Sequence, residues 1–189
     1  CGFCAIQRSV RSLRFWHPRI MTALRPGVVA SLVTLTAKSG PELLERFLFM
    51  SRCLAHFWKQ ADTRGGRRRK RAISSAIGAC FSFEVKRGEG TRGGGWHVHT
   101  HGVVLSEGPL DGEAIAAEWC ALTGQSDPRG QDVRLLKSFT RFDAEDLTEA
   151  QLSESVGDDL CEVFKYPMKF AGMVPADRYG AFRDLYRRR

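Results

Sequence analysis

Residues 95–105 read Gly95-Trp96-His97-Val98-His99-Thr100-His101-Gly102-Val103-Val104-Leu105. The Trp, Val and Leu content is typical of a β-strand, and successive side chains of a strand point to opposite faces. Histidines at every second position therefore share one face. The chain has only five histidines, and imidazole is the commonest metal-ligating side chain. This pattern predicts a divalent-metal site on one face of a sheet; the alternative is a strand whose histidines face solvent.

The hydrophobic periodicity divides the remaining chain into strands and helices. We expect strands over 28–36, 76–86, 96–105 and 132–136, and helices over 42–60, 115–122 and 147–170. The glycine-rich segment 87–95 favours an antiparallel hairpin between the strands on either side of it. The order β-α-β-β-α-β-α predicts an α+β fold, a two-layer antiparallel sheet with helices of the ferredoxin/RRM-like kind.

The chain divides into three expected parts. Residues 1–26 form a basic segment without an independent core, residues 27–175 form a single domain, and residues 176–189 form a basic tail. Cys1 and Cys4 have the spacing of half a tetrahedral zinc site, which suggests the remnant of a structural Zn²⁺ module whose other ligands precede this sequence. The other four cysteines stand alone in apolar segments, a pattern typical of buried, reduced thiols.

The charge balance favours a polyanionic partner, because 29 Lys and Arg against 21 Asp and Glu give a net charge of +8. A basic cluster occupies the segment 64–71, and its candidate contacts with nucleic-acid phosphates are Arg67, Arg68, Arg69, Lys70 and Arg71. The alternative is a solvated basic loop. No apolar run approaches the roughly 18 residues of a membrane span, and no signal-peptide pattern is visible. We therefore expect a cytoplasmic protein without a membrane partner.

A second cluster of reactive side chains lies near the C-terminus. In a helix, Glu162, Tyr166 and Lys169 would lie on adjoining turns of one face. Tyrosine is a competent covalent nucleophile when its proton can leave and a nearby cation favours the phenolate. The alternative is an ordinary amphipathic helix, and Pro167 disfavours helical geometry at the residue before it.

Together these motifs resemble those of plasmid rolling-circle replication initiators, which belong to the HUH endonuclease superfamily. The resemblance spans about residues 28–170. Its first motif is Val33-Thr34-Leu35-Thr36, and it rests on the second and third motifs. His99-Thr100-His101 is similar to the family's histidine pair, with Thr100 in place of the usual hydrophobic residue. Lys165-Tyr166-x-x-Lys169 is similar to the family's tyrosine motif. His97-Val98-His99 is a rival register for the histidine pair.

The resemblance implies the HUH endonuclease fold and an enzyme that nicks single-stranded or cruciform origin DNA. Tyr166 would become joined to the 5′ phosphate, and the released 3′ hydroxyl would prime replication. Glu162 matches a glutamate that activates water or a second hydroxyl, and Lys165 and Lys169 would contact phosphates or the phenolate. A host replication protein such as a helicase is the implied partner.

The implied cofactor is Mn²⁺ or Mg²⁺ bound by His99 and His101. Our first choice for the third ligand is Glu84, on the polar face of the neighbouring strand, and His97 is the second choice. Two other functions stay open. One is a transposase or relaxase of the same class, and the other is a non-catalytic, metal-stabilised module that binds nucleic acid.

Overall fold

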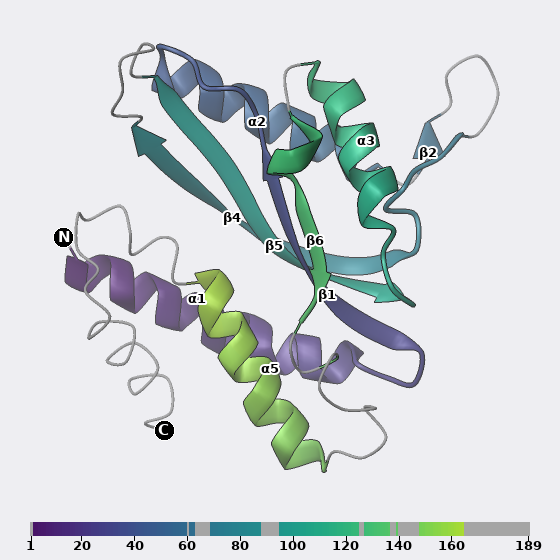
Figure 1. Ribbon diagram of the computed structural model, residues 1–189. Helices are drawn as coiled ribbons and strands as arrows, with labels where there is room; N and C mark the ends of the chain where they lie inside the picture. Colours follow the sequence, from purple (N-terminus) through teal and green to yellow (C-terminus); the bar gives the residue numbers. More distant parts are fainter. Residues whose placement is uncertain are drawn as a thin grey trace.

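The computed structural model describes residues 2–59, 61–62, 69–87, 95–124, 127–136, 139 and 148–164. Its elements, labelled in Figure 1 where there is room, are α1 (Gly2–Ala23), β1 (Val28–Thr36), α2 (Leu43–Phe57), β2 (Ala61–Asp62), β3 (Arg69–Lys70), β4 (Ala76–Arg87), β5 (Trp96–Glu107), α3 (Gly112–Thr123), the 3₁₀ turn η2 (Pro128–Gly130), β6 (Asp132–Leu135) and α5 (Glu149–Phe164). The predicted α+β class is confirmed, with four helices and a four-stranded antiparallel sheet among the described residues.

The large sheet has the strand order β4-β5-β1-β6, and every neighbouring pair is antiparallel. β4 and β5 form the long hairpin that the sequence predicts. α2 connects β1 to β4, and α3 with η2 connects β5 to β6. Within the hairpin Gly102 lies opposite Phe81, whose ring fills the space that a Cβ at residue 102 would occupy. A glycine is therefore required at this position for the strands to approach closely.

One face of the sheet is covered by α2 and α3. Val33 and Leu35 of β1 pack there in a buried cluster that includes Met50, Ile115 and Trp119. The indole N–H of Trp119 also donates to the carbonyl of residue 36 at 2.7 Å. Since both connecting helices lie on this face, they form with the sheet the predicted two-layer arrangement.

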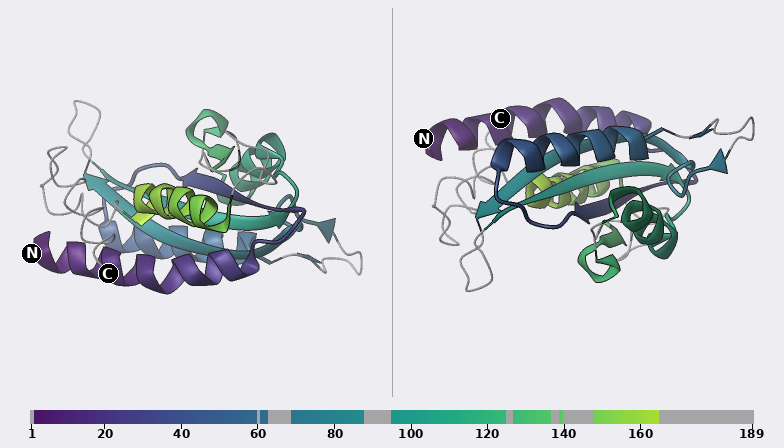
Figure 2. Two further views of the ribbon diagram at one scale, coloured as in Figure 1. Left: turned by 90° about the horizontal axis from the view of Figure 1, so that it is seen from below. Right: turned by 90° about the horizontal axis from the view of Figure 1, so that it is seen from above.

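The opposite face carries α1 and α5. Val28, Ala30 and Leu32 of β1 point there, in a cluster with Leu13 of α1 and Leu160 of α5. Figure 2 shows α5 in front of the sheet from below and α2 in front of it from above. The two-layer unit thus has helices on its second face as well.

The sequence analysis does not predict α1 as a helix. Leu13 and Ile20 are buried in the core, and Nε2 of His17 lies 2.9 Å from the carbonyl oxygen of Ser153 in α5. The core therefore continues across the boundary that the sequence analysis sets at residue 26. The signal in the sequence is weak because exposed arginines such as Arg11 and Arg14 lie between the few buried positions.

The other predicted helices are found with shifted ends. α2 ends at Phe57 instead of residue 60. α3 begins at Gly112, three residues early, because the Asp111 side chain accepts a hydrogen bond from the backbone N–H of Ala114 and caps the helix. α5 runs over Glu149–Phe164, and residues 165–170 of the predicted helix lie outside the described residues. No helix in the described part of the chain has the length and apolar character that crossing a membrane requires.

Candidate functional site

The three histidines of β5 form a continuous row on the face that α1 and α5 share. Alternation along the strand places them there together with Val103 and Leu105, as the sequence predicts. The ring centroids of His97 and His99 are 4.0 Å apart, and those of His99 and His101 are 6.0 Å apart. Val103 and Leu105, which follow the histidines on the same face of the strand, are buried in the core.

Glu84 lies where the sequence analysis expects it. In the β4–β5 hairpin it is opposite His99, and its side chain is only 2 % exposed. Its Oε2 lies 3.0 Å from Nε2 of His101, which is diagonal to it, and its Oε1 lies 3.4 Å from Nζ of Lys86. The buried carboxylate therefore contacts an imidazole and an ammonium group, as a carboxylate removed from water requires.

His101 is held at both ring nitrogens. Oγ1 of Thr34, the residue opposite it on β1, lies 3.0 Å from Nδ1, and the Glu84 carboxylate lies at Nε2. The ring is buried. These two contacts fix the orientation of the imidazole. Histidines that bind metals commonly have such a partner at the nitrogen that does not bind the metal, and Thr34 has this position at Nδ1.

His99 has the opposite character. Among the residues that the structure describes, its Nε2 is buried and has no hydrogen-bond partner. Burial lowers the pKa of His99 to about 4, and the neighbouring His97 contributes to the decrease. The imidazole is therefore neutral near neutral pH, which is the form that binds metals.

His97 lies at the end of the row. Oγ of Ser39 is 3.0 Å from its Nδ1. Burial also lowers the pKa of His97, and Lys86 on the opposite strand adds to this effect. Its contact with an exposed loop residue distinguishes His97 from the more enclosed His101.

The donor set suits a divalent cation. Nε2 of His99, Nε2 of His101 and the carboxylate of Glu84 are two nitrogen donors and one oxygen donor, a combination that Mn²⁺ accepts readily and Mg²⁺ accepts less well. No three His, Cys, Asp or Glu side chains in the described ranges are arranged as a ready coordination shell. At this site His101 and Glu84 are hydrogen-bonded to each other at 3.0 Å, and binding a cation would replace that hydrogen bond.

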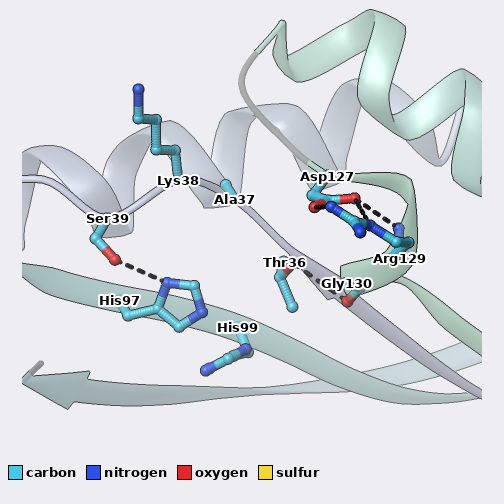
Figure 3. Close-up of a pocket in the computed structure, with 9 residues that line it drawn as sticks. All are labelled: Thr36, Ala37, Lys38, Ser39, His97, His99, Asp127, Arg129 and Gly130. Atoms are coloured by element: carbon cyan, nitrogen blue, oxygen red, sulfur yellow. Dashed lines mark hydrogen bonds and ion pairs between the residues drawn. The ribbon is translucent and has the colours of Figure 1, made fainter.

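A pocket adjoins the histidine row. It has a volume of about 780 Å³ and is lined by Thr36, Ala37, Lys38, Ser39, His97, His99, Asp127, Arg129 and Gly130. Figure 3 shows the two imidazoles on one side and the Asp127–Arg129 pair on the other, with Lys38 extending away from the imidazoles. No sequence pattern points to Lys38, Ser39 or Arg129, because only the fold brings the end of β1 and the turn η2 beside β5.

The structure describes only part of the C-terminal motif. Glu162 is in the last turn of α5, but its side chain, like Lys165, Tyr166 and Lys169, lies outside the described residues. α5 itself packs on the sheet face that carries the histidines, and its final residue, Phe164, belongs to the core there. The last described residue before the tyrosine motif thus lies on the histidine side of the sheet.

Arg71 is the one predicted nucleic-acid contact whose side chain the structure describes. Arg67 and Arg68 lie outside the described residues, and Arg69 and Lys70 form β3, of which only the backbone is described. Arg71 is 10 % exposed and lies 2.6 Å from Oε1 of Glu118 in α3. Its other Nη group is 3.0 Å from Nε2 of His56 in α2. The structure therefore shows Arg71 as a link between two helices at the base of the basic loop.

The candidate zinc residues give no cluster in the described residues. Cys1 lies outside them, and Cys4 is on α1 with an undescribed side chain.

Comparisons of the chain with protein-family models, with curated proteins and with solved structures found no match.

Proposed function

We propose that this protein is a metal-dependent endonuclease and strand transferase of the HUH type, which nicks single-stranded origin DNA in the cytoplasm and starts rolling-circle replication. The observation that carries the proposal is Nε2 of His99, which is buried beside His101 and Glu84 and has no hydrogen-bond partner in the part of the chain that the structure describes. These donors lie on the sheet face against which α5, the helix leading into the tyrosine motif, is packed.

The topology supports the same proposal. The strand order β4-β5-β1-β6, with α2 and α3 on one face, is that of a split β-α-β-β-α-β domain of the ferredoxin-like kind. In this arrangement β1 and β5 are the central strands, and the histidine row is on one of them. A central strand is a rigid support for a site that must hold its groups in fixed geometry.

His99, His101 and Glu84 would hold the cation, and Thr34 would orient the His101 ring from its outer side. A divalent cation there would polarise a phosphoryl oxygen and offset negative charge during transfer. Lys86, which contacts Glu84, limits the net negative charge of the site. The neutral state of His99 leaves its nitrogen available as a donor near neutral pH.

Tyr166 supplies the nucleophile in this proposal. Its Oη forms a bond to the scissile phosphorus, the bond from phosphorus to the 3′ oxygen breaks, and the phenolic proton passes to a base. The 3′ oxygen leaves and is protonated, so that the products are a 5′-phosphotyrosine link and a free 3′ hydroxyl. Glu162, in the last turn of α5, would act as general base when water or a second hydroxyl resolves the link.

The test is formation of a covalent adduct. The full chain is incubated with Mn²⁺ and a pool of randomised single-stranded oligonucleotides that carry a label at the 3′ end. We expect a labelled protein band that survives denaturation and is lost in Tyr166→Phe. The chain's other two tyrosines give matched controls, since Tyr179→Phe and Tyr186→Phe should keep the band. Sequencing the attached strands would identify the preferred cleavage site.

Two results would contradict the proposal. One is a pool that yields no adduct with either Mn²⁺ or Mg²⁺, and the other is an adduct that persists in Tyr166→Phe. Retention of the DNA without any adduct would favour the non-catalytic, nucleic-acid-binding alternative. A transposase or relaxase of the same class would give the same adduct and would be distinguished from an initiator by the plasmid or mobile element that carries its gene.

A further inference from the structure

We propose that the pocket beside His97 and His99 binds the sugar-phosphate of the nucleotide adjoining the cleaved bond in single-stranded DNA, with Lys38 and Arg129 as its phosphate contacts. This inference rests on the proposed function and extends it to a particular surface. None of the pocket's basic residues belongs to the arginine-rich segment 64–71.

The walls of the pocket are tied to one another. The backbone N–H of Thr36, at the end of β1, donates to Oε1 of Gln131 at 2.8 Å, and its hydroxyl donates to the carbonyl of Gly130 at 3.2 Å. On the other side Oγ of Ser39 contacts His97. Hydrogen bonds thus join the β1 end both to η2 and to β5, so the pocket is largely formed before a ligand arrives.

The positive charge of the pocket comes from two of its lining side chains, Lys38 and Arg129. Lys38 lines the pocket and is exposed, and because it extends away from the imidazoles in Figure 3, its side chain would turn toward them to contact a phosphate. The side chain of Arg129 is 91 % exposed. Since Asp127 balances one of these two cations, the pocket has a modest positive charge that suits one phosphodiester.

Arg129 is held in place without losing all its donors. Asp127 accepts hydrogen bonds from the backbone N–H, Nε and Nη2 of Arg129, at 2.9, 3.2 and 2.9 Å. A guanidinium has five N–H donors, so others stay available for phosphate oxygens. Because the pair immobilises a long side chain in advance, less conformational entropy is lost when a phosphate binds.

The size and position of the pocket favour a nucleotide. A volume of about 780 Å³ is far more than a single cation needs and lies within the usual range of small-ligand sites, roughly 300–1,000 Å³. His97 and His99 line the pocket and also belong to the row of candidate metal ligands. A nucleotide in the pocket would therefore lie directly beside the phosphate that is proposed to react. Unpaired nucleotides can enter such a pocket, whereas a duplex holds its bases stacked.

The experiment compares variants of the full chain that remove the same charge. Lys38→Ala/Arg129→Ala removes both cations from the pocket. Arg25→Ala/Arg52→Ala is the matched control, because Arg25 is an exposed residue paired with Glu107 at the opposite end of β1, and Arg52 is exposed on α2, the helix of the other sheet face. Binding of a fluorescent single-stranded oligonucleotide is measured by anisotropy over a range of salt concentrations, without divalent cations.

We expect the pocket variant to bind roughly tenfold more weakly and the salt dependence to become less steep by about 0.7, since one neutralised phosphate of a single strand contributes about that much. The control should stay close to wild type, and Lys38→Arg/Arg129→Lys should restore most of the binding. Equal losses in the pocket variant and the control, or an unchanged salt dependence in the pocket variant, would overturn the inference.

The adduct assay separates this inference from the proposed function. Adduct formation by wild type, together with unchanged DNA binding by the pocket variant, would exclude the pocket and leave the nuclease proposal intact. Loss of binding in the pocket variant, with no adduct from wild type, would keep the pocket as a nucleotide site and reject the nuclease.

Discussion

The hydroxyl of Thr34 lies 3.0 Å from Nδ1 of His101, across the pairing of β1 with β5. Both residues are in central strands of the sheet, so the contact depends on the fold and not on local sequence. On the other side of the ring, Nε2 faces the buried carboxylate of Glu84. A hydroxyl at Nδ1 helps to fix the orientation of the ring, so that Nε2 points toward the place beside Glu84 where a cation would bind.

We therefore expect Thr34→Val, which keeps the shape of the side chain and removes its hydroxyl, to weaken Mn²⁺ binding by roughly tenfold or more. Calorimetric titration with Mn²⁺ measures the affinity, and the ¹⁵N chemical shift of Nδ1 of His101 in the metal-free protein reports whether this nitrogen is hydrogen-bonded. Thr34→Ser should behave like wild type in both measurements.

Thr36→Val provides the matched control for this prediction. Thr36 lies two residues further along the same strand, but its hydroxyl contacts Gly130 and Gln131. Its replacement should leave the Nδ1 chemical shift of His101 unchanged. The same Nδ1 shift and the same Mn²⁺ affinity in wild type and Thr34→Val would show that the hydroxyl does not orient the ring.

The choice of third ligand gives a second prediction. Glu84→Gln removes a charged donor but keeps an amide that can still contact His101, whereas His97→Ala removes a ring held by the exposed Ser39. We expect Glu84→Gln to reduce Mn²⁺ affinity more than His97→Ala does, in the same calorimetric titration. Equal losses would remove the preference for Glu84, and a larger loss in His97→Ala would favour the rival register of the histidine pair.

The depressed pKa of His99 has a consequence for stability. In the folded protein the pKa is about 4, against an ordinary value of 6.5. Between these values the unfolded chain binds more protons than the folded chain, so the free energy of unfolding decreases as the pH falls from 6.5 to about 4. Below that range both states are protonated and this contribution stays constant.

We expect His99→Gln to show a smaller loss of stability across this range than wild type. Urea unfolding at a series of pH values, in the presence of a metal chelator, gives the comparison. Some pH dependence should remain, because burial also lowers the pKa of His97. An identical pH dependence in both proteins would mean that the folded environment does not disfavour protonation of His99.

Local sequence patterns were sufficient for part of this site. The row of histidines follows from the period of two along one strand, and the position of Glu84 opposite His99 follows from the antiparallel hairpin. These predictions need only neighbouring elements. They could therefore be made before the sheet was known.

Non-local pairing determines the remaining contacts. Thr34 reaches His101 only because β1 lies beside β5, and Arg129 reaches the histidine pocket only because η2 precedes β6 on the far side of β1. Neither relationship leaves a periodic signal in the sequence. Helix α1 was missed for a different reason, since its apolar stripe is interrupted by arginines, and packing against α5 contributes to its stability.

Arg71 shows how a charged residue in a basic cluster can have a structural role. Its guanidinium contacts Glu118 of α3 at 2.6 Å and His56 of α2 at 3.0 Å, and the other carboxylate oxygen of Glu118 accepts from the backbone N–H of Ala72 at 2.7 Å. The side chains of Arg71 and Glu118 are only 10 % and 19 % exposed. Charge-assisted hydrogen bonds that are this enclosed are stronger than those of an exposed ion pair.

We expect Arg71→Ala to lower the free energy of unfolding by roughly 1–3 kcal/mol, as measured by urea denaturation, while the salt dependence of single-stranded DNA binding stays unchanged. Glu118→Gln should be destabilising as well. The double variant should lose less free energy of unfolding than the sum of the two single losses, because the residues interact directly.

Arg67→Ala/Arg68→Ala, in the same basic segment, is the comparison: it should reduce the salt dependence and leave stability nearly unchanged. A salt dependence that decreases in Arg71→Ala without a loss of stability would instead place this guanidinium on the DNA.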